Sequence, residues 1–307
     1  MDGYTASELT SIFAMQGFAG ISLFSVFVLM ALGLAIIFGQ MGVINMAHGE
    51  FLTIGAYTTV VMSNLTQSYF PEFTAYYFVF SIIVAFFIAF IVGYIVEYLM
   101  IRHLYHRPLD TLLATWGLSL IMQQVFRSSF GAREVSAVLP DWLLGSLQVT
   151  ETIEIPLNGL FVLVLTFLLS VGVFVFMYRS RWGLKVRATT QNRLMSGAVG
   201  IDTHKVDRLT FAVGCGIAGV AGSAFTTIAS TGPTSGSLYI VDTFLVVVFG
   251  GAASLYGMFA SAFSIAQAQS IMEFFMTGSM AKVLTLLTVI LILMMRPEGL
   301  FTIKVRK

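Results

Sequence analysis

Long apolar runs separated by short polar segments constrain this chain more than any other feature. A helix needs about 20 mostly apolar residues to cross the hydrocarbon core of a bilayer. The runs show no sustained two-residue alternation, which an outer-membrane β-barrel would require. We therefore predict an all-α polytopic membrane protein with about nine transmembrane helices, within a range of about eight to ten. The predicted spans are 16–38, 43–62, 74–100, 111–126, 157–178, 208–231, 239–257, 258–275 and 281–295.

Charge is scarce throughout the chain, which excludes a soluble enzyme. Only 10% of the 307 residues are charged, whereas soluble proteins have about 25%. The sequence contains no glycine-rich loop ending in Gly-Lys-Ser/Thr, no His-Glu-x-x-His pair and no Gly-x-Ser-x-Gly turn. We therefore expect one membrane domain over residues 1–307, with no catalytic residues, no metal site and no cofactor bound by this chain.

The positions of Lys and Arg predict the orientation of the spans, because these residues concentrate in cytoplasmic loops. Most of the 16 Lys and Arg residues fall in the segments 101–110, 179–208 and the tail that begins at Arg296. We predict that these segments face the cytoplasm and that the acidic loop 127–156 is periplasmic. We place Lys282 on that outer side. The N-terminus is then outside and the C-terminus inside.

The stretch from Gly39 to Gly55 is the most unusual part of an apolar run. Its polar residues Asn45, His48 and Glu50 stand among several glycines. Glycine-broken helices with polar residues line cavities in membrane transporters. We predict such a cavity here, and the alternative is a hydrogen-bonded helix kink. A second glycine-broken run divides residues 239–275, at Gly250-Gly251 or at Tyr256-Gly257.

Three further carboxylates lie within or beside predicted spans, where an ionised group is costly enough to suggest a functional site. We expect Asp242 and Glu273 to have no basic partner within the spans, and Glu97 to reach water at a cytoplasmic end. Gln267, Ser270 and Glu273 recur every three residues, which places them in one polar stripe on a helix. This stripe is expected either to face a cavity or to join helices by hydrogen bonds.

The cytoplasmic loop 179–208 contains a second unusual feature. Residues 189–201 are predicted to form a short helix that is capped by Thr189 or Thr190 and has one apolar side. An exposed apolar side between basic flanks suggests docking into a groove on a cytoplasmic partner. The alternative is that the charges only fix orientation and contact anionic lipid. The candidate docking residues are Arg187, Asn192, Arg193, Leu194, Met195, Ala198, Gly200 and Ile201.

Several segments form a recognisable pattern over nearly the whole chain. They are Gly33–Phe51, Gly183-Leu-Lys-Val-Arg-Ala188 with Gly200-Ile201, Ala218-Gly-Val-Ala-Gly222 and Arg296-Pro-Glu-Gly-Leu-Phe301. These segments resemble the permease subunits of ABC importers for branched-chain amino acids and urea. Within that family the chain looks most like the urea permease subunit. The segments behind this likeness are Leu113–Leu120, Gln123-Gln124, Gly232-Pro233 and Tyr239–Gly251.

The resemblance implies a type II-like ABC importer permease in the inner membrane of a bacterium. It further implies a second, related permease subunit in a heterodimer, two cytoplasmic ATPase subunits that hydrolyse ATP, and a periplasmic solute-binding protein. Contact with membrane lipid is expected, and no nucleic acid partner is expected. The segment 179–208 is then the coupling loop that contacts an ATPase subunit.

We expect urea or a similar small neutral amide as the substrate, because carboxylates without basic partners do not suit a zwitterion. The alternative within the family is a branched-chain amino acid. Alternatives of other classes are a passive channel or ion-coupled transporter that uses the buried carboxylates, and an intramembrane hydrolase that uses His48. The candidate pathway residues are Asn45, His48, Glu50, Thr115, Gln123, Asp242, Gln267, Ser270 and Glu273.

Overall fold

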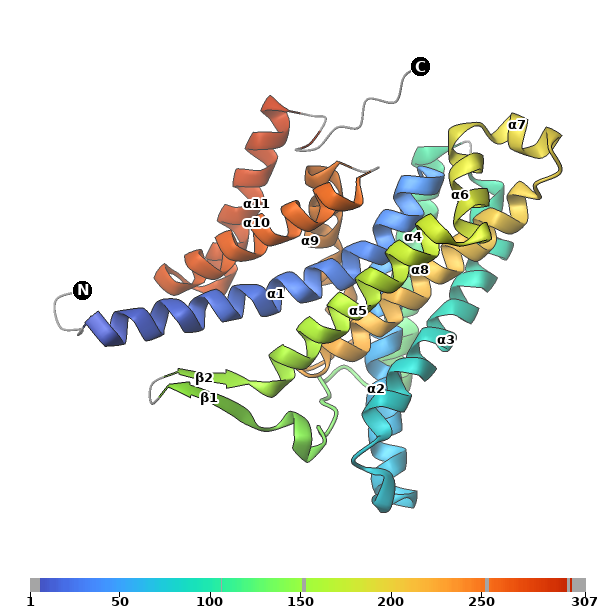
Figure 1. Cartoon of the computed structure of the whole chain (residues 1–307). Coiled ribbons are helices and arrows are strands. Elements are labelled where there is room, and N and C mark those ends of the chain that lie inside the picture. The colour runs from blue at the N-terminus through green and yellow to red at the C-terminus, as the bar shows by residue number, and fades with distance from the viewer. Residues whose placement is uncertain (1–5, 106, 151–152, 252–253, 297–298, 300–307) are drawn as a thin grey trace.

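Helices make up most of the chain in the computed structural model, which describes residues 6–105, 107–150, 153–251, 254–296 and 299 (Figure 1). The predicted basic tail, 297–307, lies outside the described residues apart from Gly299. The helices are α1 (Ala6–Met41), α2 (His48–Tyr69), α3 (Tyr77–Leu99), α4 (Pro108–Phe130), α5 (Leu157–Arg179), α6 (Arg181–Gln191), α7 (Arg193–Ala198), α8 (Thr203–Phe225), α9 (Ser235–Gly250), α10 (Leu255–Phe275) and α11 (Gly278–Met295).

Five segments are long and apolar enough to cross a membrane: Ile12–Gly39, Tyr77–His103, Leu157–Arg179, Thr203–Phe225 and Gly278–Met295. Each overlaps a predicted span, so the prediction of a polytopic helical membrane protein is confirmed. The other four predicted spans coincide with α2, α4, α9 and α10, which are shorter or carry more polar residues. The count of nine spans, with the N-terminus outside, stays a prediction.

A short β-hairpin departs from the all-α prediction. Strands β1 (Ser146–Thr150) and β2 (Ile153–Pro156) pair antiparallel within the predicted periplasmic loop, with Leu147 opposite Ile155 and Gln148 opposite Glu154. Apolar and polar residues alternate along both strands, which is the period of a half-buried strand. The alternation is short enough to be hidden in a loop that is otherwise acidic and irregular.

The centre of the bundle is formed by α1 and α8. In their most apolar stretches 72% and 83% of the residues are buried, against 17–22% in α3, α5 and α11. Helix α8 packs against α1, α2 and α3. A Cβ atom on Gly222 would lie 1.9 Å from the carbonyl oxygen of Leu52, and one on Gly55 would lie 1.9 Å from that of Gly219. Only glycine therefore permits this approach of α2 and α8.

Both glycine-broken runs end a helix. After α1, Gly42 adopts a φ of 63°, and α2 begins at His48. After α9, Gly251 adopts a φ of 94° before α10 begins at Leu255. Positive φ is the conformation that glycine adopts without steric cost. The break predicted at Gly250-Gly251 is confirmed, and α2 is a helix of 22 residues.

The loops gather at two opposite ends of the bundle (Figure 1). At the end that carries α6 and α7, here called the basic end, the Arg193 guanidinium lies 5.6 Å from the centre of the Tyr105 ring. At the other end, here called the hairpin end, Val135 and Thr231 exchange two backbone hydrogen bonds of 2.8 Å. The segments predicted to be cytoplasmic, 101–110 and 179–208, therefore lie together.

Candidate functional site

A buried polar seam joins α2 to α4. The Glu50 Oε1 atom accepts hydrogen bonds from Ser119 Oγ and Gln123 Nε2, both at 2.9 Å. Thr115 lies one turn earlier on α4, where its Oγ1 accepts a bond of 3.1 Å from the Met46 backbone N–H. The spacing of four residues between Thr115, Ser119 and Gln123 places all three on one side of α4. Glu50, Thr115 and Gln123 are thus brought together, and Ser119 is a member that the sequence reasoning missed.

Asn45 and His48 lie just outside this seam, at the start of α2. The Asn45 Oδ1 atom accepts a bond of 3.1 Å from the Ala47 backbone N–H, so this side chain stabilises the turn into α2. His48 Nε2 lies 3.3 Å from the Met30 carbonyl oxygen on α1. Among the described residues no hydrogen bond joins His48 to a serine, so the arrangement of a hydrolase is not present there. Both side chains and Glu50 are buried, which keeps solute away from them in this conformation.

A cavity of about 470 Å³ lies toward the hairpin end, and two of the other predicted polar residues, Ser270 and Glu273, line it. Its walls come from α1, from the C-terminal ends of α8 and α10, and from the first turns of α9 and α11. The lining residues are Ala19, Ser22, Leu23, Val26, Phe225, Ile228, Ala229, Tyr239, Gln269, Ser270, Glu273, Gly278, Ser279 and Lys282. The cavity therefore combines an apolar wall with a few charged and polar groups.

The expectation that Asp242 lacks a basic partner is wrong. Lys282 Nζ lies 2.7 Å from Asp242 Oδ2 and donates a bond of 3.1 Å to the Leu238 carbonyl oxygen. It also lies 4.8 Å from the centre of the Tyr239 ring. Residue 282 belongs to the first turns of α11, and its long side chain reaches back across to α9 instead of extending outward. The pair is separated by 40 positions in the sequence, which is why local inspection missed it.

The polar stripe on α10 is confirmed only in part. Ser270 and Glu273 line the cavity, and Ser270 also bonds to Gln16 on α1. Gln267 packs instead at Gly20, where an added Cβ would lie 2.6 Å from its Oε1. Its place in the cavity is taken by Gln269, whose Nε2 donates a bond of 3.0 Å to Glu273 Oε1. Gln269 and Glu273 are therefore an i, i+4 pair, the spacing at which side chains interact along a helix.

At the basic end, the predicted helix 189–201 is divided into α6 and α7. Asn192 interrupts it and caps α7 by accepting a bond of 2.9 Å from the Met195 backbone N–H, so neither Thr189 nor Thr190 is the cap. Gly200 has a φ of 86° and ends the segment. The division reflects the strong preference of Asn for N-cap positions.

The apolar side of this segment differs in one residue from the prediction. Leu194 is 90% exposed and Met195 60% exposed, as a docking surface requires, and Ala198 is also exposed. Ile201 turns inward and packs against the hydrophobic core, and Val199, 70% exposed, takes its place. We call Leu194, Met195 and Val199 the α7 face.

Arg187 does not contribute to the α7 face. Its guanidinium donates to the Met177 carbonyl oxygen at the end of α5 and lies 5.2 Å from the centre of the Tyr178 ring. This side chain therefore fastens α6 to α5, and Arg187 is a structural residue in this conformation.

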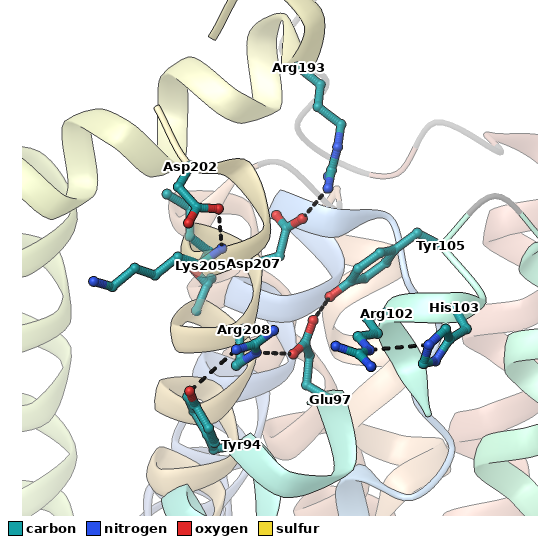
Figure 2. A network of polar contacts seen from close by, with 12 residues as sticks. Tyr94, Glu97, Arg102, His103, Tyr105, Arg193, Asp202, Lys205, Asp207 and Arg208 are labelled. Carbon is teal, nitrogen blue, oxygen red and sulfur yellow. Dashed lines mark hydrogen bonds and ion pairs between the residues drawn. The ribbon is translucent and has the colours of Figure 1, made fainter. Parts of the chain in front are cut away.

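Glu97 is buried and not in contact with water, contrary to expectation. It accepts a bond of 2.6 Å from the Tyr105 hydroxyl and pairs at 2.9 Å with Arg208, as Figure 2 shows. Burial and the bond to Glu97 raise the pKa of Tyr105 above its ordinary value, so its hydroxyl stays protonated and donates.

Comparison with known proteins identifies the type of molecule. Residues 17–293 match the family model described as the permease component of branched-chain amino acid transport systems. The chain is 27% identical to the high-affinity branched-chain amino acid permease protein LivH of Salmonella typhimurium, over 96% of this chain and 97% of that protein. It is 27% identical to BraD of Pseudomonas aeruginosa over 92% and 93%, and 26% identical to a probable LivH of Methanocaldococcus jannaschii over 89% and 87%.

No solved structure matches the chain significantly. The family match nevertheless spans almost all of the helical bundle, from α1 to α11. The chain therefore belongs to the family of permease components of branched-chain amino acid transport systems, which are membrane subunits of ABC importers.

Proposed function

We propose that this chain is the permease subunit of an ABC importer that carries a branched-chain amino acid across the inner membrane. ATPase subunits dock on the α7 face, a second permease subunit completes the pathway, and a periplasmic solute-binding protein delivers the solute at the hairpin end. The basic end faces the cytoplasm, because the Lys- and Arg-rich segments lie there. The membrane-embedded position follows from the five apolar helices.

Two opposite charges at the cavity, those of Lys282 and Glu273, are the observation that carries the choice of substrate. An amino acid is a zwitterion and needs both a cation and an anion in its path. Lys282 has three donors, of which Asp242 and Leu238 engage two among the described residues. The remaining donor suits a carboxylate, while Glu273, at the same cavity, suits an ammonium group.

The apolar wall of the cavity supports the same substrate. Leu23, Val26, Phe225 and Ile228 line the same cavity as the charged groups, and such apolar groups stabilise a branched aliphatic side chain by removing it from water. Urea has no apolar part and no charge, so neither feature favours it. A neutral amide was expected because Asp242 was thought to have no basic partner. Asp242 is paired with Lys282, so its carboxylate no longer favours urea over a zwitterion.

Uptake by the complete complex tests the proposal. The two permease subunits, the ATPase subunits and the solute-binding protein are reconstituted in proteoliposomes, and uptake of radiolabelled leucine and urea is measured with and without ATP. We expect ATP-dependent uptake of leucine. Lys282→Met is expected to lower it at least tenfold, whereas the control Ser279→Ala, an uncharged residue of the same cavity, leaves it near the wild-type rate.

Two outcomes contradict the proposal in different ways. ATP-dependent uptake of urea without uptake of leucine would show that the substrate is wrong. Solute flux through this chain alone, in vesicles without ATPase subunits, would show that it is a channel or a secondary transporter.

A further inference from the structure

Two neighbouring residues on α8 hold the basic end together through separate ion pairs. Asp207 Oδ2 lies 2.5 Å from Arg193 Nη2 on α7, and the Arg208 Nε atom lies 2.9 Å from Glu97 Oε2 on α3. Figure 2 shows both pairs side by side. Helix α8 is thus connected to α7 by one residue and to α3 by the next.

The second pair is enclosed by aromatic rings. The Arg208 guanidinium lies 4.7 Å from the centre of the Tyr98 ring and 5.4 Å from that of Tyr94. Tyr105 completes the arrangement, because its hydroxyl donates to Glu97 and its ring lies beside Arg193. Arg193, Asp207, Arg208, Glu97 and Tyr105 therefore form a closed cluster in which each member contacts or adjoins the next (Figure 2).

Helix α7 has little other attachment to the bundle. Of its six residues only Ser196 is buried, and the α7 face points away from the protein. Asp207 is buried whereas Arg193 is partly exposed, and removal of Arg193 would leave a buried carboxylate without its partner, which is destabilising. The Arg193–Asp207 pair therefore gives α7 a side-chain connection to α8 in addition to the short segment 199–202 that joins the two helices along the chain.

The far end of α8 reaches the proposed pathway. Eighteen residues separate Asp207 from Phe225, which is about 27 Å along a helix at 1.5 Å per residue. Phe225 lines the cavity, and the close glycine contacts of α8 with α2 leave little room for the helix to bend there. A displacement at Asp207 is thus carried to the cavity wall by the helix as a unit.

We propose that the Arg193–Asp207 pair is a strut that transmits movement of the ATPase subunits from α7 to α8, while Arg208 and Glu97 transmit it to α3. Asp207 is on this view a positioning residue that does not touch the solute. The inference rests on the proposed function, because it requires ATPase subunits on the α7 face. It differs from docking itself, since the strut acts after the ATPase subunits have bound.

The ratio of ATP hydrolysed to solute imported tests the strut in the complete complex. Asp207→Asn keeps the size of the side chain and removes its charge. We expect this variant to co-purify with the ATPase subunits and to hydrolyse ATP, but to import leucine at least tenfold more slowly, so that the ratio rises at least tenfold. The matched control is Lys205→Gln, which removes an exposed charge from the same turn of α8 and should leave the ratio unchanged.

Exchanging the charges of Arg193 and Asp207 distinguishes transmission of movement through the strut from a role of these residues in folding alone. The double variant Arg193→Asp with Asp207→Arg is expected to recover part of the uptake that each single variant loses. A wild-type ratio in assembled Asp207→Asn or Arg193→Gln would contradict the strut, and so would failure of both variants to bind the ATPase subunits. In contrast, if α7-face variants still bind the ATPase subunits, it is the proposed docking that fails.

Discussion

At the scale of single residues, Glu50 shows how this protein accommodates a carboxylate within the bundle. The side chain has no exposed surface, and two donors from α4 share one of its oxygens. Buried donors that lose their acceptor keep the cost of desolvation without the compensating bond. Glu50 is therefore the polar anchor between α2 and α4, beside the stacking of Tyr57 on Phe130.

The variant Glu50→Ala tests this role. It removes the acceptor that Ser119 and Gln123 share, although Gln123 keeps a bond of 3.1 Å to Ser119 Oγ. We expect the free energy of unfolding to fall by about 1–3 kcal/mol. Glu50→Gln keeps an acceptor oxygen at nearly the same place and should lose less. The measurement is the thermal unfolding midpoint of the purified protein in detergent. Equal midpoints for Glu50→Ala and wild type would show that the seam is energetically unimportant.

At the scale of helices, the closest contact in the bundle is made by backbone atoms. The α2–α8 crossing depends on the missing side chains of Gly55 and Gly222. Small residues permit such approach in membranes, where the gain comes from van der Waals packing. An added methyl group here has no free volume to enter.

Gly222→Ala is therefore expected to be destabilising, by about 1–3 kcal/mol, which is the usual cost of overpacking. The matched control is Gly117→Ala on α4, where an added Cβ has no atom within 4 Å. Alanine should stabilise that helix by about 0.5–1 kcal/mol, because it has less conformational entropy to lose. The expected result is a lower unfolding midpoint for the first variant and an equal or higher one for the second. A reversed order would contradict the described crossing.

The α7 face leads to a prediction about assembly. Leu194→Asp combined with Met195→Asp places charges on the surface that is proposed to enter a groove of the ATPase subunit, while both positions are exposed and tolerate charge in the isolated chain. We expect normal membrane insertion and loss of co-purification with the ATPase subunits. Gln191→Asp, on the exposed end of α6, is the control. Retained co-purification of the double variant would place the docking surface elsewhere.

At the scale of the whole molecule, the orientation in the membrane can be measured directly. The single native cysteine, Cys215, has no exposed surface, so it gives little background in labelling experiments. Leu147→Cys on the hairpin is expected to react with a membrane-impermeant maleimide from outside intact cells. Leu194→Cys should react only after the cells are opened. Labelling of Leu194→Cys from outside would reverse the orientation.

How far the sequence predicts this molecule depends on the range of the interactions involved. Helices could be placed because span length and glycine breaks are local features, as at Gly250-Gly251. The partners of Asp242 and Glu97 could not be predicted from the sequence, because Lys282 lies 40 positions from Asp242 and Arg208 lies 111 positions from Glu97 along the chain. Those pairings are set by the packing of α9 with α11 and of α3 with α8. The physical reason given for a neutral amide as substrate was wrong for the same cause, because it assumed that Asp242 has no basic partner.

The central position of α1 has a consequence for the synthesis of the protein. This helix precedes the other described helices in the chain, yet it packs mainly against α8 and α10, which begin 162 and 214 positions after its last residue. At about 5–20 residues per second, a ribosome needs about 10–40 s to produce them. During that interval α1 resides in lipid without these two native neighbours, and its apolar composition keeps it stable in the bilayer until α8 and α10 are inserted.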